Sequence, residues 1–179
     1  MALLRLTPSG LLAFGRRIPC TIGRGGIVTA AQKREGDGAT PSGDLRILGC
    51  LYRPDRMQRP VPWAEPILPG DLWSDASAAP DYNSHVRVPY TASHEALRRA
   101  DPLYDLVLIT DWNYPNAQPG RGSAIFIHRW RRLGAPTAGC LAMAPQNLMW
   151  LVQRLIPGDR LRIPEPPAGR LNRRYHSGI

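Results

Sequence analysis

Short apolar segments with polar residues between them recur along most of the chain, and glycine or proline interrupts them every few residues. This pattern predicts short β-strands, which we place over residues 2–6, 11–14, 17–22, 44–52, 104–110 and 123–128. The first two strands are expected to form a hairpin that turns at Pro8-Ser9-Gly10. Residues 53–70 are expected to form a proline-rich loop, and residues 71–90 an irregular segment.

The hydrophobic period changes after residue 140. Pro145 is placed to begin a helix, which Pro157-Gly158 would end. Apolar residues recur between them at helical spacing: Leu148, Leu151, Val152, Leu155 and Ile156. A second short helix is predicted over 94–100, with Ser93 as N-cap, and a last strand over 159–163. Around the second helix we expect a surface charge network of Glu95, Arg98, Asp101 and Asp105.

These elements predict a mainly β fold, a sandwich or barrel with a few short helices. The 19 prolines and 17 glycines favour the same class, because they suit many short strands joined by turns better than a helical bundle. At 179 residues we expect one domain over residues 1–163, with a Pro/Arg-rich C-terminal tail over 164–179. We expect a monomer, and no apolar run is long enough to cross a bilayer.

The formal net charge of +9 comes from 23 basic and 14 acidic residues, and Lys33 is the one lysine. Arginine suits carboxylates and phosphates, so an anionic wall polymer or nucleic acid would fit this charge. A genome-wide bias towards arginine codons would give the same count. Nucleic acid is not expected as a partner, since the aromatic residues are not interleaved with arginines on any one strand.

Two of the three cysteines, Cys20 and Cys50, lie in strand-like apolar segments. We expect both to be buried thiols, and a disulfide between them stays open. The N-terminal segment does not have the pattern of a signal peptide, because Arg5 and Pro8 interrupt its apolar residues and no small-x-small site follows. A cytoplasmic start and an unusual export route both stay open.

The stretch "IFIHRWRRLGAPTAGCLAM" (125–143) carries the candidate chemistry. His128 ends a strand, and Cys140 follows twelve residues later behind Gly139. If the loop folds back, the imidazole can take the thiol proton, and backbone N–H groups around Gly139 can receive the oxyanion of an attacked carbonyl. A buried structural cysteine is the ordinary alternative. No CxxC or HxxxH spacing occurs, so neither a metal nor a cofactor is expected.

The sequence resembles the L,D-transpeptidase catalytic domain family (the YkuD type), in which a histidine precedes a Ser/Thr-x-Gly-Cys element. Here that pattern is His128 followed by Thr137-Ala-Gly-Cys140. Four further segments resemble one bacterial subgroup that has a long Thr-Pro-x-Gly segment: "KREGDGATPSG" (33–43), "DLWSDASAAPDYN" (71–83), "HEALRRADPLYDLV" (94–107) and "GRGSAIFIH" (120–128). The resemblance extends over residues 17–163 and implies a mainly β sandwich or barrel.

The resemblance implies that Cys140 is the nucleophile and His128 its base, that Gly139 shapes the oxyanion site, and that Thr137 holds the hydroxyl position ahead of it. Two positions depart from the family. Many members have glycine directly after the histidine, where this chain has Arg129, and arginine two residues after the cysteine, where it has Ala142. The substrate-holding role of that arginine either passes to Arg129, Arg131 or Arg132 or is absent.

The implied reaction is acyl transfer on peptidoglycan stem peptides through a cysteine thioester, with the donor L-centre at the third or first stem residue. Hydrolysis by an L,D-carboxypeptidase or endopeptidase, and non-catalytic binding of wall polymer or nucleic acid, are the alternatives. Tyr82 and Asn83 are further candidates to line the cleft, although capping is the more usual role of such an asparagine. The substrate implies a periplasmic or cell-envelope location.

Overall fold

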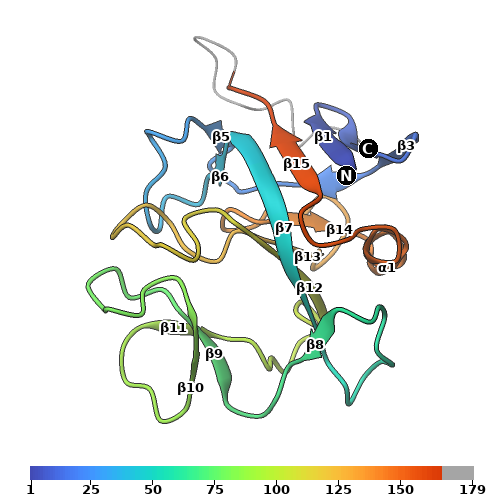
Figure 1. The fold of residues 1–179 in the computed structure, drawn as a ribbon. Helices are drawn as coiled ribbons and strands as arrows, with labels where there is room; N and C mark the ends of the chain where they lie inside the picture. The colour runs from blue at the N-terminus through green and yellow to red at the C-terminus, as the bar shows by residue number, and fades with distance from the viewer. Residues whose placement is uncertain (167–179) are drawn as a thin grey trace.

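The computed structural model describes residues 1–166, and a curved main sheet forms its centre (Figure 1). Ten strands make up this sheet, with β8 (Ala64–Pro66) joined to β7 beside the main path. The spatial order of the others is β3 (Arg16–Ile18), β2 (Gly10–Ala13), β1 (Leu3–Thr7), β15 (Arg160–Ile163), β7 (Gly43–Tyr52), β12 (Leu106–Thr110), β13 (Phe126–Arg129), β14 (Leu141–Met143) and β4 (Cys20–Thr21).

The two end strands of this sheet, β3 and β4, are consecutive in the sequence and separated by Pro19 alone. The sheet must therefore curl until its ends meet, as in a barrel. Pro19 lacks a backbone N–H, which explains why the single strand predicted over 17–22 is divided at this point. The mainly β fold predicted from the sequence is confirmed.

The long strand β7 crosses most of the molecule and joins the two halves of the sheet (Figure 1). It pairs with β15 and β12 at its two flanks, both antiparallel. The first hairpin is also confirmed: β1 and β2 pair antiparallel, with Thr7 opposite Gly10. Gly10 has φ +120°, and a side chain there would collide with the backbone oxygen of Ile18, so this turn requires glycine.

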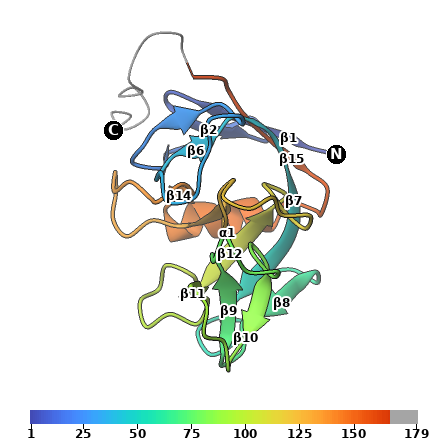
Figure 2. The ribbon, with the colours of Figure 1, turned by 90° about the vertical axis from the view of Figure 1, so that its left-hand side faces the viewer.

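The predicted helix after residue 140 is confirmed as α1 (Pro145–Val152), which lies against one face of the main sheet (Figure 2). It begins at Pro145 as expected but ends four residues before Ile156. Ile156 is exposed and precedes Pro157, whose ring disfavours the helical conformation in the residue before it.

A three-stranded sheet corrects two further predictions. It consists of β10 (His85–Arg87), β9 (Asp71–Ser74) and β11 (His94–Ala96), in that spatial order. Residues 71–90 are thus not irregular throughout, and the helix predicted over 94–100 is wrong. A seven-residue helix gains few hydrogen bonds for the cost of nucleation, whereas β11 completes its ladder with β9 and buries Leu97 fully. In both views the three-stranded sheet lies below most of the main sheet (Figures 1 and 2).

The remaining pair, β5 (Ile27–Val28) and β6 (Thr40–Pro41), is parallel, and β6 contains the Thr-Pro of the long Thr-Pro-x-Gly segment. Cys20 and Cys50 are both free thiols, so the disulfide left open is not formed. None of the helices among the described residues has the length and apolarity needed to span a membrane. Of the Pro/Arg-rich tail predicted over 164–179, residues 167–179 lie outside the described part of the chain.

Two apolar clusters lie on opposite faces of the main sheet, and β-strand alternation assigns each residue to one of them. Ile127 and Leu141 belong to the larger cluster beneath α1. Phe126 and Cys140, their neighbours in sequence, belong to the second cluster, which also contains Trp73 of β9. The second cluster therefore fills the space between the main sheet and the three-stranded sheet.

Candidate active site

His128 lies on β13 and Cys140 directly before the neighbouring strand β14, and both face the same cleft. Strands β13 and β14 are parallel, with His128 opposite Ala142. Cys140 precedes β14 and lies beside Phe126, whose backbone N–H donates to Sγ at 3.4 Å. Because side chains two residues apart on a strand point to the same face, His128 projects to the side of Phe126 and Cys140. Both line a cleft of about 510 Å³.

The Cys140 thiol is buried, with 7% of the residue exposed. Its hydrogen bond goes to the carbonyl oxygen of Ala124 at 3.0 Å, rather than to the imidazole. Burial, and after it the negative charge of Glu95, raises the pKa of the Cys140 thiol to about 12. The thiol is therefore protonated at neutral pH.

His128 is fixed through one ring nitrogen. Nδ1 lies 2.7 Å from the carbonyl oxygen of Arg129, which can only accept, so the proton of the neutral ring is on Nδ1 and Nε2 carries the free lone pair. Burial lowers the pKa of His128 to about 4. A neutral imidazole with a free Nε2 is the form that a general base needs.

The His128 ring predicts a specific pH dependence of stability. Its pKa is near 6.5 in the unfolded chain and about 4 in the folded one, so the unfolded state binds more protons between these values. The free energy of unfolding should therefore fall by about 3 kcal/mol as the pH drops from 7 to 4. Urea unfolding at both pH values should show this extra loss in the wild type relative to His128→Gln. Equal losses in the two proteins would contradict a buried neutral imidazole.

The turn before Cys140 requires glycine at position 139. Gly139 has φ +143°, and an added Cβ would lie 3.0 Å from the carbonyl oxygen of Ala39. Its carbonyl oxygen accepts a hydrogen bond from Thr40 Oγ1 at 2.7 Å, so the Thr-Pro-x-Gly segment directly supports this turn. Thr137 closes the turn from the other side: its Oγ1 donates to the carbonyl of Cys140 at 2.6 Å and accepts from the Gly139 N–H at 3.1 Å.

The cleft carries both signs of charge. The side chains that line it include four cations, Arg24, Lys33, Arg99 and Arg131, and three carboxylates, Glu35, Asp75 and Glu95. Lys33 and Arg99 are engaged in ion pairs with Asp37 and Asp101. Within the described residues, Arg24 and Arg131 form no ion pair, so they are the cations best placed to receive an anionic ligand.

Only part of the predicted substrate-binding set lines this cleft. Thr137 and Arg131 do, whereas Arg129 and Arg132 are not among the lining residues. Arg132 is exposed, and Arg129 Nε is buried without a hydrogen-bond partner among the described residues. The position of Arg129 follows from strand geometry, because this residue comes directly after His128 and so points to the other face of β13.

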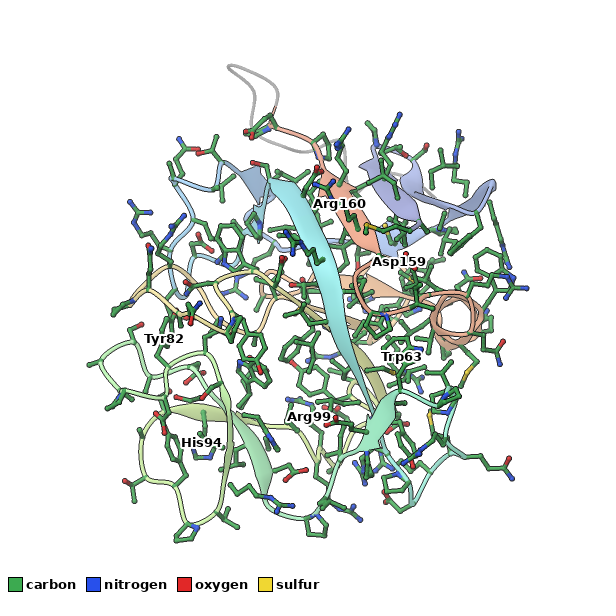
Figure 3. All side chains as sticks on the ribbon, in the orientation of Figure 1. Trp63, Tyr82, His94, Arg99, Asp159 and Arg160 are labelled. Atoms are coloured by element: carbon green, nitrogen blue, oxygen red, sulfur yellow. The ribbon has the colours of Figure 1, made fainter. Side chains whose placement is uncertain are left out.

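Tyr82 and Asn83 lie behind the cleft wall rather than in it. The Tyr82 hydroxyl donates to Glu35 and accepts from the Gly122 N–H at 2.9 Å. Asn83 is 1% exposed, and its amide bonds groups from three separate segments. In Figure 3 Tyr82 lies to one side of the molecule, whereas Arg99 lies nearer its middle.

Sequence reasoning missed several residues that line the cleft: Arg24, Lys33, Glu35, Asp75, Glu95, Arg99, Tyr104 and Trp130. Glu95 and Arg99 come from the segment mistaken for a helix, and Glu95 turns into the cleft instead of joining a surface network. One available signal was the Thr-Pro-x-Gly segment (33–43) that carries part of the family resemblance, because it supplies Lys33 and Glu35. Among residues 1–166 no cluster of three or more His, Cys, Asp and Glu could hold a metal ion.

Comparison with known proteins adds one match. The family model described as the YkuD L,D-transpeptidase catalytic domain matches residues 6–163. No curated protein and no solved structure matches the chain. The matched range contains every strand from β2 to β15 and both His128 and Cys140.

Proposed function

Because the chain belongs to the L,D-transpeptidase catalytic domain family, we propose that it cross-links peptidoglycan stem peptides through a thioester on Cys140. The observation that carries the proposal is that His128 on β13 and Cys140, directly before the neighbouring strand β14, line one cleft. The family acts on the cell wall, so the proposed place of action is the periplasm or cell envelope.

The first step is attack of Sγ on the carbonyl carbon of an L-residue in the donor stem. The thiol turns from the Ala124 carbonyl towards His128, and Nε2 takes its proton as the S–C bond forms. The C–N bond to the following D-residue then breaks, and His128 returns the proton to the leaving amine. A thioester and a neutral imidazole remain.

The oxyanion of the tetrahedral intermediate needs donors that point at it. The Gly139 N–H is engaged with Thr137 Oγ1, so we assign the backbone N–H of Cys140 to the oxyanion. The role of Gly139 is then to let the turn adopt its positive φ and bring that amide to the cleft.

Resolution of the thioester decides the product. Attack by the amine of a second stem peptide gives a cross-link, and attack by water gives a shortened monomer. The donor centre is the third or first residue of the stem. We assign Arg24 and Arg131 to the stem carboxylates, which would replace the arginine that many family members carry where this chain has Ala142.

Mass spectrometry of purified muropeptides incubated with the protein tests this proposal. Cross-linked dimers formed by the wild type and not by Cys140→Ala are expected, and fragmentation identifies the linked residues. Shortened monomers without dimers would make the protein a hydrolase. An unchanged mixture with both proteins would contradict the proposal and favour a binding role. A steep salt dependence of binding to wall polymer or DNA would then identify that role.

A further inference from the structure

Glu95 occupies the middle position of β11, and its side chain is directed away from solvent. Its two neighbours on the strand, His94 and Ala96, are both exposed, so alternation turns Glu95 to the opposite face, where it lines the cleft. One carboxylate oxygen, Oε2, accepts a hydrogen bond from the Tyr104 hydroxyl at 2.5 Å. The carboxylate and the hydroxyl thus connect the three-stranded sheet to the segment that leads into β12.

Tyr104 in turn packs directly against the imidazole. The ring centroids of Tyr104 and His128 are 5.2 Å apart with an interplanar angle of 75°, an edge-to-face contact. The guanidinium of Arg99 lies 5.2 Å from the centroid of the Tyr104 ring, and Phe126 makes a second edge contact with that ring. The Tyr104 ring is therefore enclosed on several sides, and its hydroxyl is anchored at Glu95.

The orientation of His128 depends on this ring. The hydrogen bond from Nδ1 to the Arg129 carbonyl restrains the imidazole on one side. Contact with Tyr104 supplies the second restraint, which sets the plane of the ring and so the direction of Nε2. A proton transfer from Cys140 requires that direction to be correct.

We propose that Glu95 is a positioning residue: by holding the Tyr104 hydroxyl, it fixes the plane of the His128 ring and directs Nε2 towards Cys140. The inference concerns the geometry of the pair, and its catalytic consequence rests on the proposed acyl transfer. Burial and the like charges of Asp75 and Glu35 raise the pKa of Glu95, which agrees with a carboxylate held in place inside the cleft.

Three variants separate the hydrogen bond from the charge. Glu95→Gln retains an oxygen that accepts from Tyr104 and removes the charge, whereas Glu95→Ala and Tyr104→Phe remove the hydrogen bond. Tyr90→Phe is the matched control, because the Tyr90 hydroxyl also bonds a carboxylate of the same region, Asp81 at 2.7 Å, but Tyr90 does not line the cleft.

Nuclear magnetic resonance of histidine-labelled protein reads the ring geometry without any substrate. The His128 signals, assigned with His128→Gln, should carry a ring-current shift from Tyr104. This shift should move in Glu95→Ala and Tyr104→Phe and stay in place in Glu95→Gln and Tyr90→Phe. An unchanged shift in Glu95→Ala would overturn the proposal.

Steady-state kinetics on stem peptides then measures the consequence. Glu95→Ala and Tyr104→Phe should lower kcat by about tenfold with KM nearly unchanged, and Glu95→Gln should restore kcat to within about twofold of the wild type. A raised KM with unchanged kcat in Glu95→Ala would make Glu95 a substrate-binding residue. A kcat of Glu95→Gln as low as that of Glu95→Ala would show that the rate depends on the charge of Glu95 and not on its hydrogen bond. Either result overturns the positioning role. If the wild type itself transforms no stem peptide, the proposed function fails, while the resonance shifts still decide the inference about Glu95.

Discussion

Replacing Cys140 by alanine is expected to abolish the covalent intermediate and to lower the rate of stem-peptide conversion by a factor on the order of 10⁴ or more. Among the described residues that line the cleft, Cys140 has the only sulfur atom, so its loss removes the atom that would form the thioester. Intact-protein mass spectrometry after mixing with a donor peptide should show an adduct on the wild type, with the mass of the donor minus its leaving D-residue, and none on Cys140→Ala.

The chain offers matched controls for this loss. Cys20 and Cys50 are free thiols whose pKa burial raises to about 12, as it does for Cys140, but neither lines the cleft. Cys20→Ala and Cys50→Ala should therefore form the adduct as the wild type does. An adduct that persists in Cys140→Ala and disappears in either control would show that another residue is the nucleophile.

Replacing Asn83 by alanine is expected to cost about 3 kcal/mol of the free energy of unfolding and to lower Tm by roughly 6–12 °C. Asn83 Oδ1 accepts from Trp73 Nε1 and from the Ala124 N–H, each at 2.9 Å. Nδ2 donates to the carbonyls of Trp112, at 3.1 Å, and Asn113, at 2.6 Å. Alanine would leave these buried groups unpaired, and it tolerates the φ of +55° at this position less well than asparagine.

The same variant should affect the site, because Ala124 carries the carbonyl that accepts the hydrogen bond of the Cys140 thiol. Calorimetry or urea unfolding measures the loss, and Asn116→Ala is the control, since Asn116 is exposed in the neighbouring loop. A change in Tm for Asn83→Ala as small as that for Asn116→Ala would contradict the role of this amide in holding the segments together.

The sequence alone predicted the elements whose signals are local. Apolar segments bounded by turn residues identified β7, β12 and β13, and Pro145 identified the start of α1, because these signals lie within the elements themselves. The motif from His128 to Thr-Ala-Gly-Cys140 also singled out two residues that share the cleft and the need for glycine ahead of the cysteine, because a positive φ favours that residue type.

The tertiary structure decided everything that depends on what a segment packs against. Residues 94–96 form a strand because β9 offers them a ladder, and this choice turns Glu95 from a surface position into the cleft beside Tyr104. Asn83 likewise does not line the cleft: it is buried, and its side-chain amide joins separate segments by hydrogen bonds. Composition and spacing show which chemical groups are present in the chain. The pairing of distant strands determines which face each side chain occupies, and this in turn sets the ionisation, orientation and accessibility of the two residues that carry the proposed chemistry.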